Sequence, residues 1–135
     1  MTGPRIKPFD WIDAFDVGED SLDRDHHELL DLINEIGRML AENQESDPIN
    51  QAMARLLERT ERHFRHEEDL MAKHDVPGLA EHRVKHTLLL TQLRDMIDGI
   101  GSSEPSDDQE TLFEKLVRWF VDHSVKYDAK IKGMI

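Results

Sequence analysis

Apolar residues recur at alternating steps of three and four positions in four stretches of the chain, which is typical of helices buried along one face. The stretches span residues about 20–42, 48–74, 79–99 and 108–132. Polar residues, prolines and glycines separate them at 43–48, 75–78 and 99–108. None of the stretches shows the two-residue alternation of a half-buried strand. Four helices of about 20 to 27 residues with mostly short connections predict an all-α fold, an antiparallel up-down-up-down four-helix bundle.

The length and the net charge of the chain indicate how many domains it forms and which partners it is not expected to bind. A chain of 135 residues is long enough for one domain with a hydrophobic core and too short for two. We therefore expect an N-terminal arm over residues 1–19 and a single helical domain over residues 20–135. The formal net charge of −12 repels nucleic acid and anionic lipid, so neither is an expected partner.

Three absences restrict the expected chemistry and location of the protein. Without any cysteine the chain has no disulfide, no thiolate metal site and no thiol nucleophile. The N-terminal residues lack the apolar segment of a signal peptide, and no apolar run approaches the roughly 20 residues that span a bilayer. We expect a cytoplasmic protein without membrane insertion.

Six ionisable residues occupy positions on the apolar faces, where the helices of a bundle turn toward the core. They are His26, His63, Glu67, His82, His86 and His123. In an up-down-up-down bundle all six fall within a few turns of the same end, because a helix rises only about 1.5 Å per residue. Burying such groups is costly unless they are satisfied, and Thr60 is the only other polar residue on these faces. A bound metal centre would convert that cost into folding free energy.

The last helical stretch needs one extra residue to keep its apolar face in register. After His123 the next apolar positions, Ile131 and Ile135, come one residue late. Placing Asp128 on the same face restores the pattern if one wide turn absorbs the additional residue. We therefore predict a π-bulge between His123 and Asp128, a feature often found at functional sites.

The spacing and the chemistry of these residues suit metal ligation. His63 with Glu67, and His82 with His86, are pairs separated by four positions, so each pair projects from one face of its helix. With Asp128 the set offers nitrogen and oxygen donors that suit iron, manganese, zinc or copper. Seven donors are too many for one tetrahedral zinc ion. Two six-coordinate ions that share both carboxylates and a bridging oxygen would use all seven and keep one position open for a small ligand.

The other three histidines point away from the apolar faces, and we interpret them as surface residues. They are His27, His66 and His74.

Four segments of the sequence resemble the hemerythrins, specifically the single-domain bacterial form, from Trp11 to Asp128. The first includes Trp11, Phe15-Asp-Val-Gly18 and Asp23-Arg-Asp-His26. The others are His63-Phe-Arg-His-Glu67-Glu-Asp-Leu-Met71, His82-Arg-Val-Lys-His86 and Trp119-Phe-Val-Asp-His123-Ser-Val-Lys-Tyr-Asp128. A lone pair of histidines four residues apart occurs by chance on many helices, but seven ligands in order on four helices form a specific pattern.

The resemblance implies a non-haem di-iron centre with a bridging oxo or hydroxo group that binds O₂ reversibly. One iron would take His82, His86 and His123, and the other would take His26 and His63. Glu67 and Asp128 would bridge the two, and O₂ would bind at the iron with two histidines. The apolar neighbours expected to line the O₂ pocket are Phe64, Leu89, Trp119, Phe120 and Val125.

The sequence departs from the family pattern at two positions near these ligands. Val76 precedes Pro77 where the family often has tyrosine, and Ser124 follows His123 where an aliphatic residue is common. Neither position is a predicted ligand, so we expect both to affect access to the pocket rather than metal binding.

The leading interpretation is a binding protein that carries, stores or delivers O₂, with an oxygen-consuming enzyme as a partner, and that is not itself an enzyme. The main alternative is a di-iron oxidase or a peroxide- or NO-handling enzyme. Carboxylate-rich oxidases use Glu-x-x-His pairs on two helices, and none of the seven ligands is arranged in this way. A sensor of O₂ or redox state would usually carry an output domain, for which this length leaves no room. Storage or sensing of iron would predict readily exchanged metal.

Overall fold

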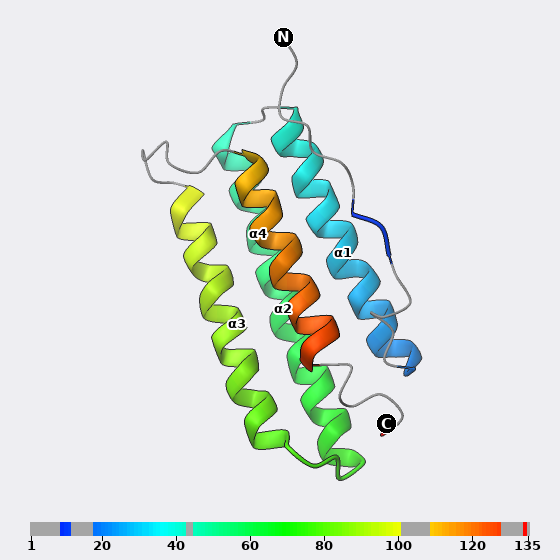
Figure 1. Ribbon diagram of the computed structural model, residues 1–135. Helices are drawn as coiled ribbons and strands as arrows, with labels where there is room; N and C mark the ends of the chain where they lie inside the picture. The colour runs from blue at the N-terminus through cyan, green and yellow to red at the C-terminus, as the bar shows by residue number, and fades with distance from the viewer. Residues whose placement is uncertain (1–8, 12–17, 43–44, 101–108, 128–133, 135) are drawn as a thin grey trace.

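The computed structural model describes residues 9–11, 18–42, 45–100, 109–127 and 134. Within these residues the chain forms helices and no strand. The helices are α1 (Asp20–Ala41), α2 (Ser46–Lys73), α3 (Leu79–Ile100), α4 (Gln109–Val121) and the π-helix η2 (Asp122–Tyr127). Successive α-helices run in opposite directions (Figure 1). The predicted all-α, up-down-up-down four-helix bundle is confirmed.

The start of α2 differs from the prediction of a loop over residues 43–48. The helix begins at Ser46, so Pro48 lies inside its first turn. A proline is tolerated there because the first backbone N–H groups of a helix have no partner within the helix and its own missing N–H is no loss. The helix therefore begins two residues before the predicted start at about residue 48, since a proline near a helix start need not mark the loop before it.

The turn between α2 and α3 ends the helix with two characteristic hydrogen bonds. The Asp75 N–H donates to the Ala72 carbonyl at 3.3 Å, and the Val76 N–H donates to the Met71 carbonyl at 2.9 Å. Asp75 has a φ of 52°, the left-handed conformation that this termination requires. The turn carries Val76 back onto the bundle, where it packs with Leu22 and Met71 in a small buried apolar cluster.

The π-helix η2 continues α4 directly. It covers Asp122–Tyr127 and so contains His123. This confirms the predicted wide turn after His123 as far as the structure describes the chain. Asp128, the residue that the wide turn was predicted to align with His123, lies outside the described residues.

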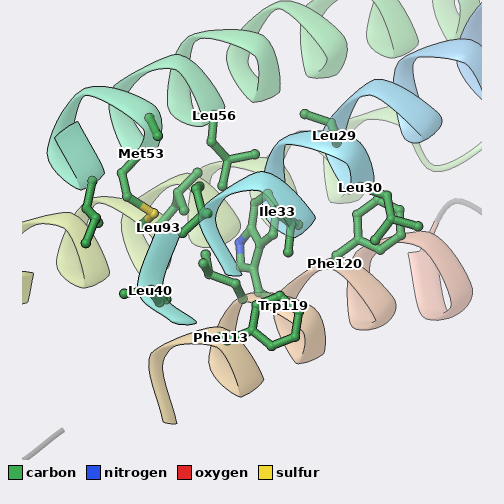
Figure 2. Packing of buried hydrophobic residues seen from close by; sticks show 14 of the residues in the cluster. Leu29, Leu30, Ile33, Leu40, Met53, Leu56, Leu93, Phe113, Trp119 and Phe120 are labelled. Carbon is green, nitrogen blue, oxygen red and sulfur yellow. The ribbon is translucent and has the colours of Figure 1, made fainter. Parts of the chain in front are cut away.

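The main hydrophobic core lies between all four helices. Figure 2 shows Ile33, Leu56, Leu93 and Trp119, one from each helix, gathered at its centre. Among the contacts between helices, α1 packs against α2 and α4, and α2 packs against α3. One side-chain hydrogen bond joins α4 to α3, because the buried indole N–H of Trp119 donates to the Leu89 carbonyl at 2.9 Å.

The described part of the N-terminal arm lies against α1. The Phe9 N–H donates to the Asn34 side-chain oxygen at 2.7 Å, and the Asn34 amide donates back to the Phe9 carbonyl at 2.9 Å. The Trp11 ring stacks on His27 with centroids 3.5 Å apart. The division into an arm and one helical domain stays a prediction. In the described part of the chain, no helix is long and apolar enough to cross a membrane.

Candidate metal centre

Six of the seven predicted ligands converge in the interior of the bundle. α1 contributes His26, α2 contributes His63 and Glu67, α3 contributes His82 and His86, and η2 contributes His123. All six are between 0 and 8% exposed. They lie between the main core and the small apolar cluster of Leu22, Met71 and Val76. The predicted convergence at one end of the bundle is therefore observed for these residues.

The first group of potential donors joins three helices. It comprises His26, His63, Glu67 and His123, and one ligand atom from each lies within 4.8 Å of the others. The Nε2 atoms of His26 and His63 are 3.1 Å apart, and those of His63 and His123 are 3.4 Å apart. The second oxygen of Glu67, Oε2, is 3.5 Å from the His63 Nε2.

The second group shares Glu67 with the first and adds the histidine pair of α3. Its members are Glu67, His82 and His86, again with ligand atoms within 4.8 Å of one another. The Oε1 atom of Glu67 contacts the Nε2 of His82 and lies 3.1 Å from the Nε2 of His86. Oε1 therefore faces the second group while Oε2 faces His63. That placement suits a carboxylate that bridges two cations.

His123 lies between the two groups. Its ring centroid is 5.7 Å from the ring of His26 and also 5.7 Å from the ring of His86. The family resemblance assigns His123 to the ion of His82 and His86, whereas its ligand atom falls in the group of His26 and His63. The division of the histidines between two ions stays a prediction.

Two carboxylates contact the Nδ1 atoms of two predicted ligand histidines. Asp25 accepts a hydrogen bond from the Nδ1 of His63 at 3.1 Å, and Glu68 accepts one from the Nδ1 of His86 at 2.7 Å. Burial raises the pKa of Asp25, but hydrogen bonds from His63 and His66 and the attraction of the same two rings outweigh this. The net pKa of Asp25 is below its ordinary value of 3.8. Asp25 is therefore held as an acceptor for both imidazoles.

The donors present fit a metal ion. When the Nδ1 of a neutral His86 donates to Glu68, its Nε2 carries a lone pair. That lone pair faces an oxygen of Glu67 only 3.1 Å away, and two acceptors at this distance repel each other. A cation between them would convert the repulsion into attraction. Thr60 is the other buried polar residue expected from the sequence near these groups. Its hydroxyl donates to the Leu56 carbonyl of its own helix at 2.7 Å, so its hydrogen is not available to the donor groups.

The apolar residues predicted around the O₂ site are buried where the structure describes them. Phe64 stacks on His86 with centroids 3.8 Å apart, and Phe120 meets the edge of His26 at 6.2 Å. Leu89 and Trp119 belong to the same main core. The side chain of Val125 lies outside the described part of the structure. Whether these residues form an O₂ pocket stays a prediction.

Sequence reasoning missed a group of three residues that lie beside the predicted ligands. Asp25, Glu68 and His66 lie on polar helix positions, and we interpreted His66 as a surface residue. The His66 side chain is 36% exposed, and its Nδ1 donates to Asp25 at 2.9 Å. The available signal was adjacency, because Asp25 precedes His26 and Glu68 follows Glu67.

The fold and the site together define a helical-bundle protein with a candidate metal-binding centre. Residues 17–135 match the profile of the hemerythrin HHE cation binding domain. The myohemerythrin of Riftia pachyptila is 34% identical over 126 residues, which cover 93% of this chain and 92% of that protein. A hemerythrin-like protein of Naegleria gruberi is 32% identical over 128 residues, covering 95% and 94%. The bacteriohemerythrin of Clostridium acetobutylicum is 27% identical over 130 residues, covering 90% and 97%. The chain belongs to the hemerythrin family.

Proposed function

We propose that this chain is a non-haem di-iron protein that binds O₂ reversibly and serves to carry, store or deliver it. The observation that carries the proposal is the pair of overlapping donor groups that share the buried carboxylate of Glu67. A single ion would need only one such group. Two groups with one carboxylate in common are what a pair of bridged ions requires.

The proposed ligands are the seven residues expected from the family pattern. His82, His86 and His123 would hold one iron, His26 and His63 the other, and Glu67 and Asp128 would bridge them. The donor chemistry is compatible with iron, because imidazole and carboxylate donors without sulfur suit it, and the family pattern is the reason to propose iron in particular. The two irons would supply reversible one-electron chemistry, each giving an electron to O₂ and taking it back.

The residues of the chain itself would orient the donors and exclude water. The main core lies on one side of the donor groups, and the cluster of Leu22, Met71 and Val76 lies on the other. Phe64 packs flat against His86, and Phe120 packs against His26. These apolar surfaces would keep bulk water from the centre and leave room only for a small ligand. Such an enclosed site favours binding of O₂ over turnover of a larger substrate, so we propose a binding protein rather than an enzyme.

The proposal is tested by cycling the purified, iron-loaded protein between nitrogen and O₂. After anaerobic reduction, O₂ should produce a visible charge-transfer absorption that disappears when the solution is purged and returns in the next cycle. One O₂ should bind per two irons. A zinc-loaded sample is the control, because zinc has no redox chemistry and should give no band. Irreversible oxidation with continuing peroxide turnover would favour an enzyme and overturn the proposal.

A further inference from the structure

Asp25 connects two imidazoles of α2 to α1. Its Oδ2 accepts hydrogen bonds from the Nδ1 of His63 at 3.1 Å and from the Nδ1 of His66 at 2.9 Å. The Nε2 of His66 lies in turn 3.2 Å from the Ser21 hydroxyl, one turn earlier on α1. The Asp25 side chain is only 26% exposed, so these contacts are partly shielded from water. The hydrogen bond from His66 therefore helps to keep the Asp25 carboxylate beside His63.

Glu68 makes the corresponding connection between α2 and α3. Its Oε2 accepts a hydrogen bond from the Nδ1 of His86 at 2.7 Å, and its Oε1 accepts one from the Nε of Arg83 at 3.1 Å. The two oxygens thus serve different partners. Arg83 lies on α3 one turn before His86, so the guanidinium fixes the carboxylate in the position that His86 uses.

The two carboxylates follow one rule of placement. Asp25 is the neighbour of His26 in α1 but bonds His63 in α2, and Glu68 is the neighbour of Glu67 in α2 but bonds His86 in α3. Consecutive residues of a helix point about 100° apart, since an α-helix has 3.6 residues per turn. A residue beside a ligand therefore faces the adjacent helix and reaches the ligand that this helix contributes.

The hydrogen bond at Nδ1 decides what the other ring nitrogen can do. A hydrogen held on Nδ1 leaves a lone pair on Nε2, and in both rings Nε2 is the nitrogen that faces the donor groups. A carboxylate partner also fixes the ring orientation and makes Nε2 a stronger donor. Loss of such a partner typically weakens metal binding about 10- to 100-fold.

We propose that Asp25 and Glu68 are positioning residues, one for each donor group, that hold His63 and His86 with Nε2 directed at the metal. His66 and Arg83 hold the two carboxylates in place. The inference rests on the proposed function, because it assumes that His63 and His86 are ligands. It adds to that function one positioning carboxylate for each donor group, neither of which is itself a proposed ligand.

The first test is iron retention in the full-length protein. Asp25→Ala and Glu68→Ala should release iron to a chelator about 10- to 100-fold faster than the parent protein. Asp25→Asn and Glu68→Gln keep an acceptor oxygen without the charge and should fall between the alanine variants and the parent. Asp31→Ala and Glu58→Ala, exposed carboxylates of α1 and α2, are the matched controls and should release iron at the parent rate.

The second test is a property that a loss of stability would not move. Without its carboxylate partner an imidazole stabilises ferric iron less, so the midpoint potential of the centre should rise in Asp25→Asn and Glu68→Gln. In the metal-free protein, ¹⁵N chemical shifts should place the hydrogen of His63 and His86 on Nδ1. Asp25→Asn should alter the shifts of His63 and spare those of His86, and Glu68→Gln should do the reverse.

The outcomes separate the two proposals. If the parent protein holds iron and the four variants match the controls in retention and potential, the positioning role is wrong and the proposed function stands. If the parent binds no metal, the proposed function fails, and the ¹⁵N shifts alone still decide whether the carboxylates fix the tautomers. If an alanine variant does not fold, the asparagine or glutamine variant decides.

Discussion

Among the described residues, Glu67 is the one that both donor groups share. It is fully buried, contacts three histidines from two helices, and belongs to both donor groups. A carboxylate in such a place costs free energy unless positive charge or hydrogen bonds compensate it. Its removal should therefore affect both halves of the centre together.

Glu67→Ala should reduce bound iron to less than about one ion per chain, because a bridging ligand contributes to both sites. Iron content after reconstitution and desalting measures the effect. Glu58→Ala, an exposed glutamate of the same helix, is the control and should retain the parent content. Retention of two irons by Glu67→Ala would mean that the carboxylate does not bridge.

Trp119 is a residue of the hydrophobic core that also makes one buried hydrogen bond. Its indole N–H is buried and donates to the Leu89 carbonyl at 2.9 Å. Trp119→Phe keeps an aromatic ring but loses this hydrogen bond and some volume, so the free energy of unfolding should fall by about 1–3 kcal/mol. Urea denaturation of the metal-free protein measures the change. A loss below about 0.5 kcal/mol would show that the bond contributes little.

For single residues, the sequence predicts the buried histidines better than it predicts the carboxylates that contact them. A histidine on an apolar helix face is conspicuous, and all five such histidines were found by position. Asp25 and Glu68 occupy polar positions, where most carboxylates only meet water. Their partners lie on other helices, so only the packing of the bundle reveals their role.

Among the elements, the π-helix could be predicted because it leaves a trace in the sequence. One residue too many between His123 and the next apolar positions requires a wide turn if the face is to stay buried, and η2 provides it. The start of α2 could not be placed equally well. Pro48 is compatible both with a loop and with the first helical turn, and local sequence does not distinguish them.

Asp75 adopts a left-handed conformation at the end of α2, with a φ of 52°. Glycine adopts this conformation without steric cost, and the negative charge of Asp75 is unfavourable at a helix C-terminus. Asp75→Gly should therefore raise the free energy of unfolding by about 0.5–1 kcal/mol. Thermal unfolding measures it. Asp75→Val is the opposite control and should destabilise the protein, whereas equal effects of the two substitutions would contradict the explanation.

Glu19 caps the start of α1, where its side chain accepts a hydrogen bond from the Leu22 N–H at 2.8 Å. Partial burial raises the pKa of Glu19, but hydrogen bonds from Ser21 and Leu22 and attraction to His66 lower it below its ordinary value of 4.5. Because its pKa is lower in the folded state, the ionised carboxylate of Glu19 stabilises that state at pH values above its ordinary pKa. This stabilisation is lost as the pH falls through the lowered pKa of the folded state.

Glu19→Gln should consequently cost about 0.5–1 kcal/mol at pH 7, since it removes the charge at the helix N-terminus. The difference from the parent should shrink below about pH 4.5 and vanish in stronger acid. Urea denaturation of the metal-free proteins between pH 3 and 7 measures it. A difference that does not change with pH would point to a cause other than the charge of Glu19.

Across the whole molecule, topology is what turns scattered residues into a site. His26 and His123 are far apart in sequence, but antiparallel helices bring the start of α1 beside the end of α4 (Figure 1). The helical periods and short connections were enough to predict this arrangement. The division of the histidines between two ions was not predictable from it, because His123 lies equally near His26 and His86.

The placement of the donor groups also links metal binding to folding. Every helix of the bundle, counting η2 with α4, contributes at least one donor, so two ions, one bound in each donor group, would together join all of them. Binding to the folded state alone would stabilise it by RT ln(1 + [L]/Kd), about 4 kcal/mol at a thousandfold excess over Kd. The folded bundle and the bound metal should therefore stabilise each other.

We propose above that two iron ions lie within the donor groups that share Glu67. A crystal structure of the iron-loaded protein, with anomalous diffraction recorded on both sides of the iron absorption edge, would locate these ions and identify them. We expect two iron peaks in each chain, with Glu67 coordinating both and the five histidines divided between them. A single peak, or two peaks elsewhere with these histidines hydrogen-bonded only to one another, would contradict it.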